Sequence, residues 1–155
     1  MPEIAELSLW YDLNQLMTDY WAEVDYNGGT EAHSFYTVDA VYVVGENRFE
    51  GQEKIRAFYT WRRKRGSSTT RHLLNQVRVL RAGTDSARIL GVLTLYRADG
   101  PPPFNGTHPP SLIADFEAQC ARREDGAWRI ISHVETPIFV GRDHPFSISI
   151  DPQRL

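Results

Sequence analysis

The spacing of apolar residues near the start of the chain is that of an amphipathic helix. Apolar side chains recur at intervals of three and four residues: Leu13, Leu16, Met17, Tyr20, Trp21 and Val24. In a helix these positions form one stripe that can face a core. The pattern predicts a helix over 8–25. Asn27-Gly28-Gly29 ends it, because glycine accepts the left-handed conformation that closes many helices.

Two more helices and a first strand are expected in the next part of the chain. Thr30 can cap a short second helix that buries Phe35 and Tyr36. The β-branched and aromatic run at 41–44 predicts a strand. A third helix is expected over 52–65. Its apolar stripe consists of Ile55, Phe58 and Tyr59.

The second half of the chain has the character of strands. The four segments are 71–81, 86–97, 112–123 and 128–140, and Asp-Gly in the turn between the last two is a strong hairpin signal. Helices followed by an antiparallel meander favour an α+β fold over an alternating α/β fold. The loop 98–111 holds five of the nine prolines, and a long, stiff loop between strands usually serves function or a subunit contact.

Length, charge and cysteine content limit the class of protein. The 155 residues fit one domain over 1–155, with a C-terminal tail at 141–155 that has no clear period. A formal net charge of −3 argues against nucleic acid as the main partner. Cys120 has no second cysteine with which to form an internal disulfide, and no apolar run approaches the ~20 residues of a membrane span. Met1–Leu9 is not a signal peptide, so we expect a cytoplasmic protein with no membrane partner.

Several short motifs occur in the order of a known family. They are Val24-Asp25 at the end of the first helix, Val38-Asp39-Ala40 before the first strand, Phe49-Glu50-Gly51 followed by Lys54-Ile55 and Phe58, Thr70-Arg71-His72-Leu73 with Asn75, and Asp125-Gly126-Ala127-Trp128-Arg129-Ile130. Over about residues 8–138 the chain resembles the SnoaL-like group of the nuclear transport factor 2-like superfamily. The resemblance implies a cone-shaped α+β barrel, with three N-terminal helices packed on a highly curved, mostly antiparallel sheet around a small-molecule pocket.

The same resemblance leaves the activity open. Relatives include polyketide cyclases, dehydratases, dehydrochlorinases, isomerases, dioxygenase small subunits and proteins without any chemistry. One fold therefore serves many functions, and the function has to be argued from the site.

Asp25 and His72 are the candidate catalytic residues. Asp25 closes the first predicted helix, and His72 opens the first long strand. In the dehydratase and dehydrochlorinase branches the matching pair looks across the cavity, and this implies that His72 takes a proton while Asp25 fixes its tautomer. Histidine titrates near neutral pH unaided, which suits a general base. The alternative is a polar helix end and a histidine satisfied within the sheet.

Further candidates come from the last two strands and from tyrosines. Alternation puts Asp115 and Glu117 on the face opposite small and apolar residues, towards the cavity or the solvent. The resemblance makes Glu117 a polar pocket residue, whereas the alternative is an ordinary exposed carboxylate. His133 and Glu135 are expected on one face with Ile131. His133 could bind an acidic ligand group or pair with Glu117, and the alternative is a structural ion pair in the sheet. The expected substrate-binding residues are Tyr20, Tyr42, Tyr59, Glu117 and His133.

We expect neither a metal nor a cofactor. His72, His133, Asp25 and Glu117 are metal-ligand types, but they lack the local spacing of a metal motif. The sequence also contains no G-x-S-x-G, phosphate loop or dinucleotide fingerprint. The basic run Arg62-Arg63-Lys64-Arg65 is typical of a solvated helix end, where positive charge complements the helix dipole.

Two functions follow as alternatives. The first is a cofactor-free lyase or isomerase of dehydratase, cyclase or isomerase type, which moves a proton in a small hydrophobic or aromatic substrate. The second is a non-catalytic ligand-binding or assembly module, including a role like that of an aromatic-ring dioxygenase small subunit. Both predict a homodimer, because relatives usually pair through the uncovered face of the sheet.

Overall fold

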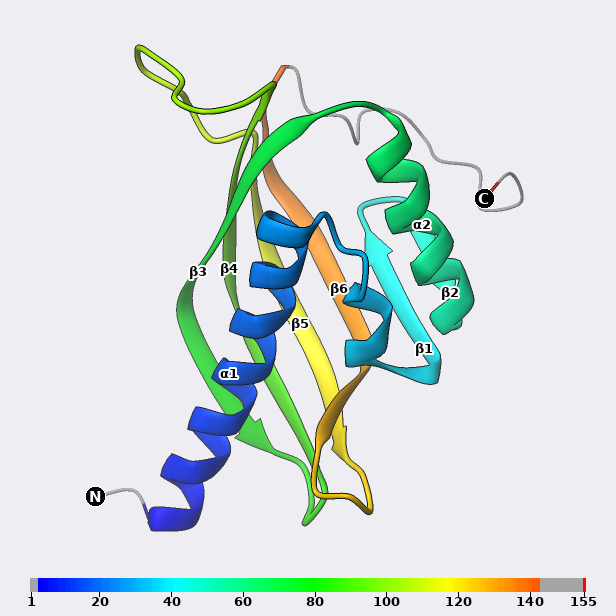
Figure 1. Cartoon of the computed structure of the whole chain (residues 1–155). Coiled ribbons are helices and arrows are strands. Elements are labelled where there is room, and N and C mark those ends of the chain that lie inside the picture. Colours follow the sequence, from blue (N-terminus) through cyan, green and yellow to red (C-terminus); the bar gives the residue numbers. More distant parts are fainter. Residues whose placement is uncertain (1–2, 143–154) are drawn as a thin grey trace.

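The computed structural model describes residues 3–142 and 155. Its elements in chain order are α1 (Ile4–Asn27), the 3₁₀ helix η1 (Ala32–Phe35), β1 (Tyr36–Val44), β2 (Asn47–Glu50), α2 (Gln52–Lys64), β3 (Ser68–Arg81), β4 (Ser86–Asp99), β5 (Leu112–Arg122) and β6 (Trp128–Val140). The α+β class predicted from the sequence is confirmed. Figure 1 shows both α-helices on one face of the sheet, α1 across the long strands and α2 beside β1.

The prediction of three N-terminal helices is wrong, because the second one is a single 3₁₀ turn. The hydroxyl of Thr30 donates back to the carbonyl of Asn27, at 2.9 Å, so it does not cap the next helix. Glu31, at the actual start of η1, makes no side-chain cap either. The aromatic and β-branched residues that follow favour the extended chain, and β1 already begins at Tyr36.

The six strands form one open, mixed sheet and not a closed barrel. Their order is β2-β1-β6-β5-β4-β3, which leaves β2 and β3 at the two edges. Most neighbours are antiparallel, as expected, but β6 returns alongside β1 in the parallel direction. Helix α1 packs against β3, the strand at one of these edges.

A bulge bends β3 near its middle. The pairing of β3 with β4 shifts between Asn75 and Arg78, and Gln76 adopts a positive φ of 51°. On β4, a Cβ added to Gly91 would lie 2.6 Å from the carbonyl oxygen of Asn75 and 2.9 Å from the ring of Phe116. Glycine is required there because the bulged strand comes so close, and the bulge increases the local twist of the sheet.

The core lies between the helices and the inner face of the sheet. On β5 the inner face carries Ala114, Phe116, Ala118 and Cys120, all buried, as the alternation predicted. Burial raises the pKa of the Cys120 thiol to about 12, so this cysteine is not a nucleophile at neutral pH.

The alternation on β6 differs from the prediction because of a second bulge. The pairing with β5 shifts between Gln119 and Cys120, which leaves Ile131 without a direct partner. Ile131 is 37% exposed, whereas His133 and Glu135 are buried. The expected grouping of Ile131 with these two residues is therefore wrong: the extra residue moves it to the other side.

Two parts of the chain complete the description. Strand β4 extends to Asp99, so the first two residues of the expected loop 98–111 belong to it, and the proline-rich segment 100–111, without helix or strand, joins β4 to β5. Most of the expected C-terminal tail, 143–154, lies outside the described residues, whereas Leu155 packs, partly buried, against the core. None of the helices in the described part of the chain is long and apolar enough to cross a membrane.

Candidate functional site

The last turn of α1 brings the carboxylate of Asp25 against the first residues of β3. Its Oδ1 accepts hydrogen bonds from Nδ1 of His72, at 2.6 Å, and from the hydroxyl of Thr70, at 2.8 Å. Its Oδ2 accepts a third from the backbone N–H of His72, at 2.8 Å. The side chains of Asp25 and His72 are each 5% exposed. These contacts fix the carboxylate and assign the ring proton of neutral His72 to Nδ1, so Nε2 carries the lone pair.

The protonation states of the pair suit a general base. Burial raises the pKa of Asp25, but the hydrogen bonds and charge of His72 and the bond from Thr70 outweigh it, so the net pKa is below the usual value. Burial, together with the charge of Arg62, lowers the pKa of His72, and the bond and charge of Asp25 offset this only in part. At neutral pH Asp25 is therefore ionised and His72 is neutral. A neutral imidazole beside a carboxylate is ready to accept a proton.

Trp21 holds the imidazole from its other side. The indole stacks on the ring of His72, with centroids 4.0 Å apart and 13° between the planes. Trp21 lies one helical turn before Asp25, so both side chains project from the same side of α1. The sequence predicted Trp21 as a core residue, and it is buried. Its spacing from Asp25 was the signal that could have assigned it to the site as well.

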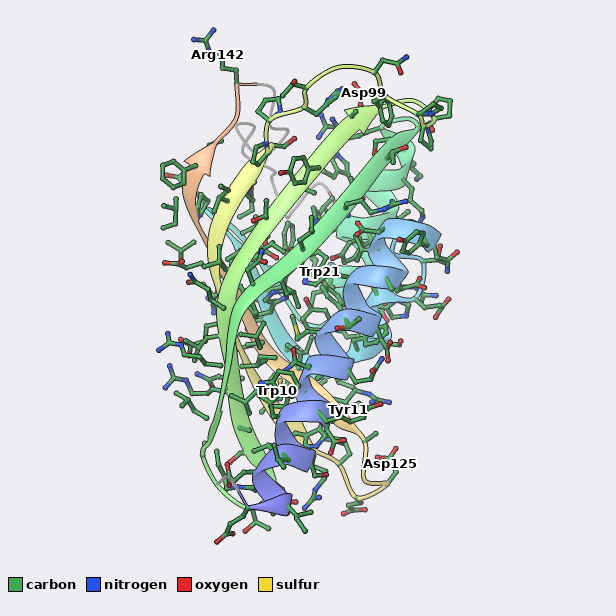
Figure 2. The ribbon with its side chains drawn as sticks, turned by 90° about the vertical axis from the view of Figure 1, so that its left-hand side faces the viewer. Trp10, Tyr11, Trp21, Asp99, Asp125 and Arg142 are labelled. Carbon is green, nitrogen blue, oxygen red and sulfur yellow. The ribbon has the colours of Figure 1, made fainter. Side chains whose placement is uncertain are left out.

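The pair borders a groove between α1 and the free edge of β3. The groove has a volume of about 600 Å³, and its walls include Trp21, Leu73, Leu74 and Tyr96. Figure 2 shows Trp21 between α1 and β3. Within the described residues, no side chain or backbone group hydrogen-bonds Nε2 of His72. The groove therefore offers a small molecule access beside an available base.

A second polar cluster lies in the interior, away from this groove. Its six members are at most 3% exposed: Tyr20, Tyr36, Tyr42, Tyr59, His133 and Glu135. The hydroxyl of Tyr36 lies 2.9 Å from the hydroxyl of Tyr20 and 2.9 Å from Nδ1 of His133. The hydroxyls of Tyr20 and Tyr59 are also hydrogen-bonded. Four of the five predicted substrate-binding residues thus come together, but their hydrogen bonds are made within this cluster.

The other half of this interior cluster joins a carboxyl group to an imidazole. Tyr42 donates to Oε1 of Glu135 at 3.0 Å, and the same oxygen lies 3.5 Å from Nε2 of His133. Burial raises the pKa of Glu135 to about 8, against the hydrogen bond from Tyr42, which lowers it. Burial also lowers the pKa of His133 to about 3. Both groups are therefore uncharged near pH 7, as expected where charge would be costly.

Trp21 separates the two clusters. Besides stacking on His72, its ring meets His133 edge-on with the centroids 5.8 Å apart. Its own Nε1 is buried without a hydrogen-bond partner, and so is Nε2 of His133. The predicted site is thus divided: Asp25 and His72 face the groove, while the tyrosines and His133 lie behind the indole.

The structure places Glu117 and Asp115 on the outer face of the sheet. Glu117 accepts a hydrogen bond from Nε of Arg88 at 2.8 Å, and its side chain is 40% exposed. On β6 it stands opposite Val134, while His133 stands opposite Ala118. The expectation that Glu117 could pair with His133 is wrong, because the two side chains point to opposite faces.

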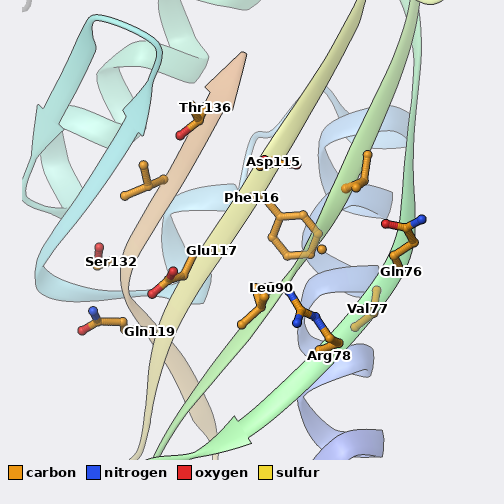
Figure 3. Close-up of a pocket in the computed structure, with 13 residues that line it drawn as sticks. Gln76, Val77, Arg78, Leu90, Asp115, Phe116, Glu117, Gln119, Ser132 and Thr136 are labelled. Atoms are coloured by element: carbon orange, nitrogen blue, oxygen red, sulfur yellow. The ribbon is translucent and has the colours of Figure 1, made fainter. Parts of the chain in front are cut away.

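The outer face of the sheet is hollowed around the β3 bulge. Figure 3 shows this hollow, of about 750 Å³, with Asp115, Phe116, Glu117 and Arg78 among its lining residues. Neither residue of the Asp25–His72 pair lines it. Across residues 3–142 and 155, no three side chains of His, Cys, Asp or Glu are grouped as a metal site would require.

Comparison with known proteins now identifies the family. The model of the SnoaL-like domain matches residues 5–134. The chain belongs to the SnoaL-like domain family. The resemblance noted in the sequence is thereby confirmed, and the match spans every element from α1 into β6. No curated protein matches this SnoaL-like chain.

Solved structures with this fold are distant in sequence. An NTF2-like protein with a cystatin-like fold from Novosphingobium aromaticivorans has a TM-score of 0.69 at 16% identity, covering 93% of this chain and 91% of its own. A putative scytalone dehydratase from the same organism has a TM-score of 0.72 at 14% identity, covering 86% of both chains. ActVI-ORFA from Streptomyces coelicolor has a TM-score of 0.73 at 12% identity, covering 83% of this chain and 97% of its own. At such identities these likenesses establish the NTF2-like, cystatin-like fold and not an activity.

Proposed function

We propose that this SnoaL-like protein catalyses a cofactor-free proton transfer on a small hydrophobic or aromatic molecule. His72 acts as the general base, and Asp25 is its positioning residue. The observation that carries the proposal is the 2.6 Å contact between Nδ1 of His72 and Asp25, which leaves Nε2 as the available base at the groove. The scytalone dehydratase named among the structural neighbours supports a dehydratase-type or cyclase-type reaction.

The chemistry follows from the charge states. His72 takes a proton from a carbon beside a carbonyl group, and the electron pair of that C–H bond forms a C=C bond as a β-hydroxyl group leaves. The imidazolium returns the proton to the departing hydroxyl, so water is released and His72 is neutral again. Without a leaving group, the enolate closes a ring onto a second carbonyl or takes the proton at another carbon. Asp25 remains ionised and stabilises the imidazolium throughout.

Exchange of carbon-bound hydrogen tests the first step without a leaving group. The probe is 2-tetralone in D₂O, in which proton NMR follows loss of the signal beside the carbonyl. We expect the wild-type protein to accelerate exchange and His72→Ala to return it to the buffer rate. His108→Ala, in the proline-rich loop, is the matched control and should exchange like wild type. Full activity of the His72 variant would refute the assignment, and wild type inactive on a panel of aryl ketones would count against an enzyme.

The second candidate function is a non-catalytic binding or assembly module. The observation that favours it is the interior cluster, in which tyrosines, His133 and Glu135 bond to one another in place of lining an open pocket. This alternative predicts ligand binding without exchange chemistry. In its dioxygenase form it also predicts copurification with a large iron-containing partner, and a preparation without one argues against that form.

We also propose that the protein is a homodimer paired through the outer face of the sheet. The hollow on this face carries half-buried apolar side chains such as Leu90, Val92 and Val134, which a second copy would cover. Light scattering at micromolar concentration should give twice the mass of the chain. A monomeric mass would refute the pairing.

A further inference from the structure

Arg71 has hydrogen-bonding capacity to spare at the edge of the groove. It precedes His72 on β3, and its Nη1 donates to the carbonyl of Thr70 at 2.6 Å. Its guanidinium lies over the ring of Tyr26, with Cζ 4.4 Å from the centroid. Within the described residues no carboxylate lies close enough to Arg71 for an ion pair. Because a guanidinium has five N–H donors, most of them remain for a ligand.

The carboxylate of Asp25, which also borders the groove, does not pair with the guanidinium of Arg71. Both oxygens of Asp25 already accept hydrogen bonds from His72 and Thr70, and the side chain is 5% exposed. An anion that enters the groove therefore meets the guanidinium in solvent, while the opposing negative charge is enclosed. The charge at the mouth of the groove is positive although the chain as a whole carries −3.

The walls of the groove suit a flat, apolar body. Leu73 and Tyr96 are 44% and 38% exposed, which is high for side chains of this size, and the buried indole of Trp21 forms the back. A planar ring in the groove would cover both exposed side chains. A volume of about 600 Å³ leaves room for a fused bicyclic molecule.

Because β3 lies at the edge of the sheet, the side chains of Arg71 and His72 can both reach one ligand. Consecutive Cα atoms are about 3.8 Å apart, and side chains alternate between the faces of a strand. In a central strand, Arg71 and His72 would be separated by the sheet. Because β3 is an edge strand among the described residues, both residues line the same groove.

We propose that the groove binds aromatic carboxylates, with the acid group held by Arg71 and the ring lying along Leu73 and Tyr96. This site deepens the proposed function: it rests on that function for the claim that the bound acid is a substrate, since the ring would lie beside His72. The binding itself stands on the groove and its unpaired arginine alone.

Two probes of equal shape test the binding. They are 2-naphthoate, which carries the charge, and 2-naphthamide, which does not, and calorimetry measures both dissociation constants. Wild type should bind the naphthoate about tenfold more tightly, the effect of one charge-assisted hydrogen bond. Arg71→Gln should remove this preference and leave the naphthamide unchanged. Arg56→Gln, an exposed arginine on α2, is the matched control and should retain the preference.

A third variant locates the site. Leu73→Glu puts a negative charge on an exposed position of the groove wall, so it should weaken both probes while the fold, followed by circular dichroism, is kept. Equal binding of the two probes by wild type, binding of neither, or a preference that survives in Arg71→Gln would each overturn the proposal.

The binding test can be read independently of the proton-exchange test. His72→Ala should keep the preference for 2-naphthoate even where it loses exchange of 2-tetralone. If the protein catalyses exchange of 2-tetralone but shows no preference for 2-naphthoate, the anion site is refuted and the proposed function stands. If it prefers 2-naphthoate but catalyses no exchange, the anion site stands and the proposed catalytic function is refuted.

Discussion

The indole of Trp21 stacks on the imidazole of His72, with 13° between the planes and ring centroids 4.0 Å apart. Trp21 thereby closes one face of the ring whose Nδ1 is held by Asp25. The same indole meets His133 on the interior side. One residue of α1 thus contacts the imidazole of His72, the proposed base, and separates the groove from the buried polar cluster. The predictions below treat these two regions as functionally distinct.

Replacing Asp25 by Asn should reduce activity with little change in fold. The amide oxygen can still accept the two hydrogen bonds made to Oδ1, whereas the NH₂ group cannot accept the bond from the backbone N–H of His72, and the side chain lacks the charge that stabilises imidazolium. Since general base catalysis contributes about 10²–10⁴-fold, we expect the exchange rate to fall by up to this factor. The pKa of His72 should fall further, because the carboxylate that raises it is gone. Asp39→Asn, on an exposed site of β1, is the control; equal rates in both variants would contradict the role of Asp25.

Replacing Trp21 by Leu should raise the pKa of His72. Burial is the largest cause of its lowered pKa, and the indole supplies much of that burial. With Asp25 still in place, a better-solvated imidazole should titrate nearer to, or above, its ordinary 6.5. NMR titration of the histidine ring protons measures the shift, and the acidic limb of the activity profile should move to higher pH with it. Trp61→Leu serves as the control, and an unmoved His72 titration would show that Trp21 does not shield the ring.

Glu135 should make stability fall between about pH 6.5 and 8. Its pKa rises from 4.5 to about 8 on folding, so in this window the folded state holds a proton that the unfolded state has released. The free energy of unfolding therefore decreases as pH rises. His133, lowered to about 3, gives the opposite slope, but only below its unfolded value of 6.5. Above 6.5 the effect of Glu135 is left uncompensated by His133.

Urea unfolding from pH 5.5 to 8.5 measures this slope. Glu135→Gln keeps a side-chain oxygen for the bond from Tyr42 and removes the titration, so its stability should be flat between pH 6.5 and 8. His133→Gln should retain the decline. A decline of equal size in the Glu135 variant would assign the titration to another group.

The sequence predicted the elements well where a periodic pattern faces the core. The helix predicted over 8–25 extends from Ile4 to Asn27, and the added first turn lacked a signal because it meets little of the core. Ile4 and Leu7 are 87% and 54% exposed there. The 3₁₀ turn and the bulge at Ile131 were missed for a different reason: each depends on local hydrogen bonding or register, which hydrophobic spacing does not encode.

The candidate site was likewise predicted only in part. Asp25 and His72 are 47 positions apart, so spacing could nominate both without indicating contact; the family resemblance implied the pairing. Alternation on β5 correctly separated Glu117 from the packed face, but it could not distinguish a cavity from solvent. The sequence did not place Trp21 in the site, because a buried indole at helical spacing is typical of a core. Its stacking on His72 is seen only in the structure.

Tyr36→Phe provides the last test, because it distinguishes a structural interior from a substrate-binding one. Loss of the hydroxyl leaves Nδ1 of His133 without its buried partner and the hydroxyl of Tyr20 with Tyr59 alone, which should cost about 1–3 kcal/mol of unfolding free energy. Tyr96→Phe, at the exposed groove wall, should cost far less. Because Trp21 stands between this cluster and the groove, Tyr36→Phe should leave the exchange rate of 2-tetralone within about twofold of wild type. A variant with normal stability and much slower exchange would move the substrate into the interior, where Tyr20, Tyr42 and His133 would contact it directly.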